Sequence, residues 1–133
     1  MATTRPSDAF LGPHWSPELI AELKQANNNG QVGTTLVSED TRVRVWLIAM
    51  QPGERLPFHT HVLDYFWVAT TPGKARSLYS NGHVAEVDYV VGDTKHFSFS
   101  RGESMTHDLE NIGETTLCFT TVEFLNSANS PLD

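Results

Sequence analysis

The two residues with the clearest chemical potential are His59 and His61, which stand one residue apart in the segment GERLPFHTH, residues 53–61. In a β-strand, side chains two positions apart point to the same face, so both imidazoles can reach one metal ion. Imidazole nitrogens bind divalent ions at about 2.0–2.1 Å. His107, in the segment GESMTHDLEN of residues 102–111, is the best candidate for a third ligand. We therefore predict a metal site formed by these three histidines.

A His-x-His pair also occurs as a surface pair or as two hydrogen-bonded polar side chains. Two local features favour a site here. A Pro52-Gly53 turn opens the strand, and Pro57 stands near its edge, where a missing backbone donor is tolerated. The remaining histidines are less suggestive: His14 lies in the N-terminal tail, and His83 follows a turn and is expected to be exposed. His96 lies in an expected strand, where either interpretation is open.

The elements that must position these histidines are mostly short strands. From residue 33 onward, apolar or alternating runs are separated by turn residues, a pattern typical of an all-β protein. We expect strands near residues 42–50, 58–69, 75–80, 85–91, 96–100 and 116–124. Asn81-Gly82 is a strong hairpin signal because both residues accept a positive φ.

One helix is expected before the strands. Ser16 can cap it, Pro17 suits its first position, and Glu18 lies at the positive end of its dipole. The run NNNG at residues 27–30 is expected to end it through a left-handed residue. The chain then divides into an arm and helix at 1–35, a barrel at 36–126 and a C-terminal tail at 127–133.

Composition narrows the class of function. The chain has 133 residues and a formal net charge of −7, which argues against a nucleic-acid partner because phosphate binding needs a basic face. No apolar run approaches the roughly 20 residues that span a bilayer, and no signal-peptide pattern is seen, so no membrane partner is expected. The single cysteine, Cys118, fits a reducing compartment, and we expect a cytoplasmic protein.

With these residues in place, the chain resembles the cupin superfamily, small β-barrels that carry two histidine motifs, and in particular the short single-domain cupins of bacterial catabolic pathways. The resemblance covers roughly residues 36–125 and implies a cupin-type antiparallel β-barrel (jelly roll) with a short N-terminal helix. The first motif is matched by Gly53, His59, His61 and Gly73, and the second, in order, by Gly92, Gly102, His107 and Asn111.

Two departures from the cupin pattern bear on the chemistry. The second motif is longer than usual and lacks its proline at Ser100. The glutamate of the first motif would fall at Tyr65 or Phe66, and neither can replace a carboxylate. Asp64 is near but has the wrong parity, so only a bulge would bring it to the histidine face. Tyr65 has the right parity and is expected to point into the barrel, where its hydroxyl can position substrate.

A site of three neutral imidazoles leaves the full charge of a divalent ion, which favours small anionic chelating ligands and strengthens Lewis acidity. The resemblance implies an iron(II) dioxygenase acting on a small organic acid or dicarbonyl. The alternatives are a non-redox isomerase or lyase and a ligand-binding cupin without turnover. Fe²⁺ is the expected ion, and because imidazole also binds Zn²⁺ and Ni²⁺, these ions and Mn²⁺ are alternatives.

Two further expectations concern Glu123 and the oligomeric state. Glu123 shares a strand face with Thr121 and Phe119. It is interpreted either as a partner that orients a histidine ring or, somewhat more simply, as a solvated residue at a strand end. The resemblance and the aromatic content together favour a homodimer.

Overall fold

The computed structural model describes residue 10 and residues 12–132 of the chain. The described part contains nine strands, one α-helix and one short 3-10 helix. The elements are α1 (Pro17–Lys24), the 3-10 turn η2 (Ala26–Asn28), β1 (Thr35–Glu39), β2 (Val43–Met50), β3 (Arg55–His61), β4 (Tyr65–Ala69), β5 (Gly73–Leu78), β6 (Val84–Tyr89), β7 (Thr94–Phe97), β8 (Met105–Asn111) and β9 (Leu117–Phe124).

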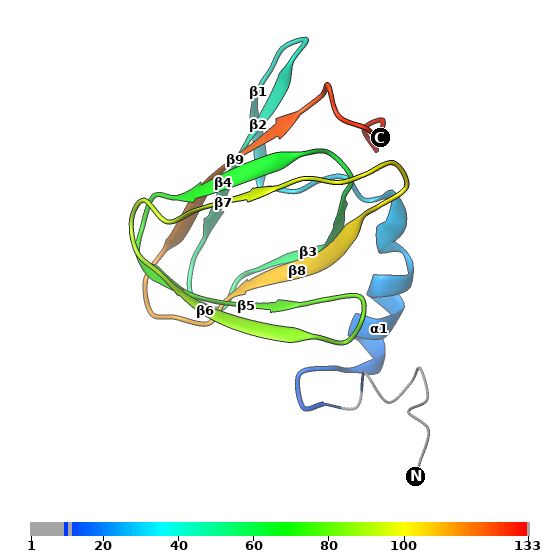
Figure 1. Cartoon of the computed structure of the whole chain (residues 1–133). Coiled ribbons are helices and arrows are strands. Elements are labelled where there is room, and N and C mark those ends of the chain that lie inside the picture. Colours follow the sequence, from blue (N-terminus) through cyan, green and yellow to red (C-terminus); the bar gives the residue numbers. More distant parts are fainter. Residues whose placement is uncertain (1–9, 11, 133) are drawn as a thin grey trace.

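The strands form two antiparallel sheets that face each other across one interior, the jelly-roll arrangement expected from the sequence (Figure 1). The five-stranded sheet has the order β1-β2-β9-β4-β7, and the four-stranded sheet has the order β3-β8-β5-β6. Apart from the consecutive pairs β1–β2 and β5–β6, neighbouring strands come from distant parts of the chain, so residues far apart in sequence share one face. This topology is what brings the first histidine segment, on β3, beside the second, on β8.

Alternation along the strands decides which side chains enter the interior. In β2, Trp46, Ile48 and Met50 are buried while Leu47 and Ala49 face outward, as a period of two requires. The same alternation in β9 buries every second residue. The resulting apolar cluster fills one side of the interior and consists of Ile48, Met50, Leu56, Ala69, Ala75, Leu109, Leu117 and Phe119.

Helix α1 begins as expected and ends differently. The Ser16 hydroxyl accepts a hydrogen bond from the Leu19 backbone N–H at 3.2 Å, and Pro17 takes the first turn. No residue at 27–30 adopts a left-handed conformation; the helix instead tightens into η2. The helix packs outside β3, where Phe58 is only 1% exposed (Figure 1). Burying such a side chain stabilises the fold by roughly 1.5–3 kcal/mol.

One strand prediction was wrong in extent, and two strands were not predicted. The expected strand at 58–69 is two strands, β3 and β4, which lie in different sheets. Leu63, 2% exposed, and Asp64, whose carboxylate accepts from the Phe99 backbone N–H, hold the crossing between them. Strands β1 and β8 were not predicted. Strand β1 is exposed throughout, and β8 buries polar residues, so neither shows the apolar alternation of a half-buried strand.

The hairpin signal was confirmed, with one change in its turn. Strands β5 and β6 pair directly, from Gly73 opposite Tyr89 to Leu78 opposite Val84. In the turn that joins them, Gly82 has a φ of 89°, while Asn81 keeps a negative φ. One glycine therefore meets the whole left-handed requirement of this turn.

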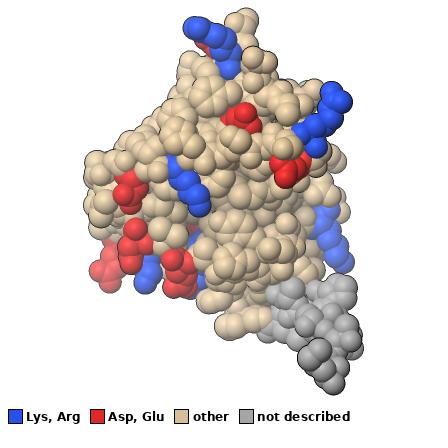
Figure 2. All heavy atoms as spheres, viewed as in Figure 1, with Lys and Arg blue, Asp and Glu red and all other residues tan. Residues whose placement is uncertain are grey.

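The surface shows no segregation of charge on the face in view. Figure 2 shows acidic and basic side chains interspersed among uncharged ones. Within the described residues, no helix combines the length and apolar character needed to cross a membrane.

Candidate metal centre

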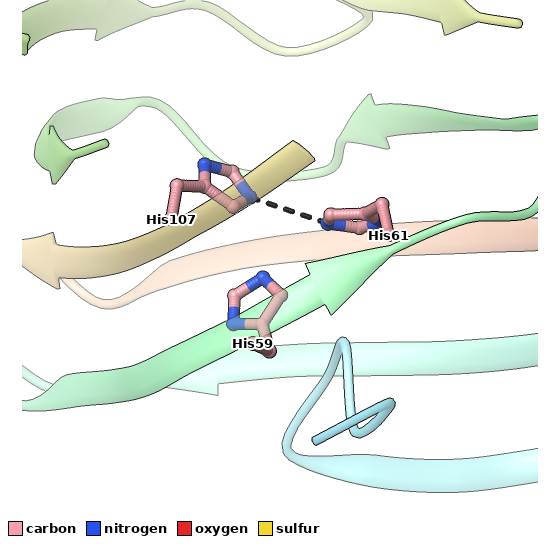
Figure 3. A group of neighbouring side chains, drawn as sticks. All are labelled: His59, His61 and His107. Atoms are coloured by element: carbon pink, nitrogen blue, oxygen red, sulfur yellow. Dashed lines mark hydrogen bonds between the residues drawn. The ribbon is translucent and has the colours of Figure 1, made fainter. Parts of the chain in front are cut away.

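The three predicted histidines lie together inside the molecule, on two adjacent strands. His59 and His61 stand on β3, and the Cα partner of His59 across the β3–β8 ladder is His107. Directly opposite residues share a face, and so do residues two apart on one strand. One potential ligand atom from each ring lies within 4.8 Å of the others (Figure 3). The spacing of the two sequence motifs thus translates into a single cluster.

The ring nitrogens of this cluster face one another. The Nδ1 atom of His59 lies 2.8 Å from the Pro57 carbonyl oxygen. A carbonyl only accepts, so this nitrogen carries the proton and the Nε2 lone pair of His59 stays free. The Nε2 atoms of His61 and His107 are 3.2 Å apart (Figure 3). Their Nδ1 atoms are buried and have no hydrogen-bond partner among the described residues.

Burial keeps all three rings uncharged near neutral pH. Desolvation lowers the pKa of His59 to about 4, with a smaller contribution from the positive charge of Arg55. Desolvation, followed by the proximity of the neighbouring histidines, lowers the pKa of His61 and of His107 well below the ordinary value. Neutral imidazole is the form that binds metals, so the site needs no deprotonation to act as a ligand set.

These residues fit a transition-metal ion. Two nitrogens that are each about 2.1 Å from one ion, at angles of about 90–110°, are about 3.0–3.4 Å apart. The 3.2 Å separation of the His61 and His107 Nε2 atoms falls in this range. Without a cation, the two facing Nε2 atoms can form only one hydrogen bond, in which one ring donates and the other accepts. A metal ion instead accepts the lone pairs of both nitrogens. The positions of the His61 and His107 nitrogens therefore fit a metal ion bound between them.

The histidines line a cavity of about 340 Å³ between the two sheets. Its apolar side is the buried core, since Ile48, Leu56, Leu109 and Phe119 belong to both. The wall is rich in aromatic rings, namely Tyr65, Trp67, Tyr79, Tyr89, Phe97 and Phe119. A concave, largely apolar cavity with a few converging polar groups is the usual form of a small-molecule site.

Tyr65 points into this cavity, as its parity predicted. It is 3% exposed, and its ring stacks on the His61 imidazole with centroids 4.1 Å apart. Burial raises the pKa of the Tyr65 hydroxyl well above its ordinary value, so the group stays protonated. All three tyrosines of the chain line the cavity, and no hydrogen bond joins their hydroxyls to another described residue. These hydroxyls can donate to a bound ligand.

No carboxylate joins the histidine cluster within the described part of the chain. Asp64 lies in the crossing between the sheets, where its Oδ1 atom accepts from the Phe99 backbone N–H at 2.9 Å. Tyr65 and Phe66 occupy the places where the cupin motif has its glutamate. Among the described residues the cluster therefore consists of imidazoles alone, and neither Asp64 nor Glu123, which the sequence left open as a fourth ligand, joins it.

Glu123 is neither solvated nor paired with a histidine. It is 3% exposed, so the simpler of the two sequence interpretations was wrong. Its Oε1 atom accepts a hydrogen bond from Trp46 Nε1 at 2.7 Å, across neighbouring strands β2 and β9. Its Cα partner on β4 is Tyr65. Desolvation raises the pKa of the Glu123 carboxyl, and the hydrogen bond from Trp46 opposes that shift.

A partly buried ion-pair network behind the site was not predicted from the sequence. Arg55 Nε contacts Asp108 Oδ2 at 2.7 Å, and the same guanidinium makes a bidentate pair with Glu22 of α1. The Asp108 Oδ1 atom accepts from the Leu78 backbone N–H at 2.7 Å. Because Asp108 follows His107 directly, the network fixes β8 against β3, β5 and α1. Arg55 and Asp108 lie within the two histidine segments, but nothing in their spacing indicates the pairing.

Asn111, the last residue of the second motif, acts on the backbone. It is 1% exposed, and its Nδ2 group donates to the carbonyls of Met50 and Thr115. Its Oδ1 atom accepts from the Gly113 N–H at 3.0 Å. It therefore anchors the end of β8 and the loop that follows, away from the cavity wall.

Comparison with known proteins identifies the fold. No protein-family model and no curated protein matches the sequence. A cupin domain protein from Bordetella pertussis Tohama I is 24% identical, with a TM-score of 0.59, over 68% of this chain and 88% of that one. A double-stranded β-helix protein from Klebsiella pneumoniae is 22% identical, with a TM-score of 0.56, over 74% and 82% of the two chains.

A cupin superfamily protein from Desulfitobacterium hafniense DCB-2 is similar at 14% identity and a TM-score of 0.51, over 68% of this chain and 73% of that one. These likenesses agree with the two facing sheets. The chain therefore has the cupin fold, the double-stranded β-helix of the cupin superfamily.

Proposed function

We propose that this protein is a mononuclear metal enzyme, an iron(II)-dependent dioxygenase acting on a small organic acid or dicarbonyl. One observation carries the proposal: three neutral imidazoles converge at the wall of an aromatic-lined cavity between the two sheets, and no described carboxylate joins them. His59, His61 and His107 would hold the ion. A bound iron(II) ion would supply open coordination positions and redox chemistry with dioxygen.

The charge of the ligand set supports the class of substrate. Imidazoles contribute no negative charge, so an ion held by them keeps its full double positive charge. Within a low-dielectric cavity such a charge strongly favours an anionic, oxygen-chelating ligand. Enolates and carboxylates have this chemistry. The cavity volume of about 340 Å³ suits a small molecule.

The chain's own residues would orient the substrate. The protonated hydroxyl of Tyr65 lies in the cavity without a hydrogen-bond partner among the described residues, so it would donate to a substrate oxygen. The rings of Trp67 and Phe97 would pack against the carbon skeleton and limit water around it. Glu123 would act indirectly, because it accepts from Trp46 of β2 on one side and lies opposite Tyr65 of β4 on the other.

A second candidate is a non-redox isomerase or lyase that uses the ion as a Lewis acid. The same donor set favours it, because imidazole also suits zinc and nickel. Manganese would serve the same role. The two candidates differ in whether dioxygen is consumed.

The experiment compares two metal-loaded forms of one protein preparation. Metal-free protein is loaded anaerobically with Fe²⁺ or with Zn²⁺, mixed with a panel of small β-dicarbonyls and 2-oxo acids, and exposed to oxygen in an oxygen-electrode cell. The dioxygenase proposal predicts oxygen uptake with substrate in the iron form alone. Product formation by the zinc form without oxygen uptake would support the second candidate. No oxygen uptake and no product in either form would count against both enzyme candidates for these substrate classes.

A further inference from the structure

We propose that Lys95 binds a second anionic group of the ligand, so that the substrate carries two acidic groups, one at the metal centre and one at Lys95. This inference rests on the proposed metal-dependent function of the same cavity. It narrows the substrate class from small acids in general to acids with two negative charges.

The strand register places Lys95 on the cavity side of β7. In the β4–β7 ladder, Lys95 lies opposite Trp67, and Phe97 lies opposite Tyr65. Lys95 and Phe97 are two residues apart, so they share a face, and all four side chains line the cavity. The Lys95 ammonium lies 5.1 Å from the centroid of the Phe97 ring, in a cation–π contact.

This ammonium is the only Lys or Arg charge among the described residues that line the cavity. No described carboxylate forms an ion pair with it, although the chain has a net charge of −7. Asp93, the one acidic side chain of the lining, accepts a hydrogen bond from the Val90 backbone N–H at 3.0 Å within the turn before β7. An unpaired cation on an aromatic wall whose one carboxylate is hydrogen-bonded within its own turn is suited to receive an anionic ligand group.

Two ring stacks separate Lys95 from the histidines. The Tyr65 ring lies parallel to His61 on one side and to Phe97 on the other, with centroids 4.1 Å and 4.6 Å apart. The ammonium sits at the far end of this row, over Phe97. A ligand chelated at the histidines would therefore run along the aromatic wall before its second acidic group reaches Lys95.

The test measures binding of matched probe pairs to zinc-loaded protein by isothermal titration calorimetry. Each pair shares a 2-hydroxy acid head and a chain length and differs only in a terminal carboxylate or methyl group. The pairs are malate and 2-hydroxybutyrate, 2-hydroxyglutarate and 2-hydroxypentanoate, and 2-hydroxyadipate and 2-hydroxyhexanoate. We expect the diacid of at least one pair to bind about tenfold more tightly to the wild type. Added salt should reduce this preference.

Three variants locate the preference. Lys95→Met should abolish it, and Lys95→Arg, which keeps the charge, should retain most of it. Lys74→Met removes an exposed lysine of β5 that does not line the cavity, so it should behave as the wild type. Equal affinities within every pair, or an unchanged preference in Lys95→Met, would overturn this inference while zinc binding stands. Failure of the wild type to bind zinc would overturn the proposed metal centre and this inference together.

Discussion

The imidazole of His61 lies parallel to the phenol ring of Tyr65, with centroids 4.1 Å apart and ring planes 10° apart. His61 belongs to β3 of the four-stranded sheet, and Tyr65 opens β4 of the five-stranded sheet. The stack therefore crosses the interior and joins the two sheets at the candidate metal site. It also restricts the rotation of the His61 ring, so Tyr65 contributes to the placement of a ligand nitrogen.

Two substitutions of Tyr65 should distinguish the contribution of its ring from that of its hydroxyl. Tyr65→Phe keeps the stack on His61, so thermal stability and metal content should stay close to wild type, while affinity for an oxygen-rich substrate falls about tenfold. Tyr65→Ala also loses the ring and should destabilise the fold by about 3–5 kcal/mol. Urea unfolding, metal analysis and ligand titration on the same preparations separate the two effects. Wild-type ligand affinity in Tyr65→Phe would show that the Tyr65 hydroxyl does not bind the ligand.

The network around Arg55 should carry much of the stability of the histidine strands. Arg55→Met leaves the carboxylate of Asp108, 2% exposed, without its counter-charge, and we expect a loss of about 3 kcal/mol in the free energy of unfolding. Arg76→Met is a matched control. Its side chain has the same 23% exposure, but its partner Glu86 is 40% exposed, so the loss should stay below about 1 kcal/mol.

Urea titrations of both variants at neutral pH, analysed with a common m-value, check this prediction. Equal losses for the Arg55 and Arg76 variants would show that burial of the partner carboxylate does not set the energy of these pairs.

The spacing of His59 and His61 predicted that they share a face because local geometry sufficed, whereas the approach of His107 depends on the pairing of β3 with β8. Side chains at i and i+2 of a strand share a face whatever sheet that strand joins, so His59 and His61 needed no tertiary information. The inward direction of Tyr65 was also predicted, but for an incomplete reason. Parity was counted along one continuous strand, whereas the chain crosses to the opposite sheet between His61 and Tyr65, and Tyr65 then faces back across the interior.

The features that sequence reasoning missed depend on long-range contacts. Strand β8 buries Asp108 and Asn111, whose polar groups are satisfied by partners on other elements. Its apolar alternation is therefore masked, and the pattern does not indicate a strand. The partner of Glu123 was unpredictable for the same reason, because Trp46 is 77 residues away and reaches it through the β2–β9 ladder.

Glu123 should give the protein a distinctive pH dependence. Burial raises the pKa of its carboxyl above the ordinary value of 4.5, so the folded state holds this proton more tightly than the unfolded state. Ionisation of Glu123 therefore lowers stability as pH rises from about 4.5 through the raised folded pKa. Glu123→Gln keeps an acceptor for Trp46 and removes that loss.

The stability of Glu123→Gln relative to wild type should consequently increase between pH 4 and pH 7. Urea midpoints at half-unit steps of pH measure this difference. A stability difference that stays constant, or that falls with rising pH, would mean that burial does not raise the pKa of the Glu123 carboxyl.

The central claim is that His59, His61 and His107 bind one divalent transition-metal ion in this cavity. The direct measurement is metal content by inductively coupled plasma mass spectrometry on protein purified without added metal, for wild type, His61→Ala and the exposed control His96→Ala. Circular dichroism verifies that each variant is folded. We expect about one ion per chain in wild type and His96→Ala and a nearly metal-free, folded His61→Ala. Wild-type occupancy in His61→Ala would contradict the central claim.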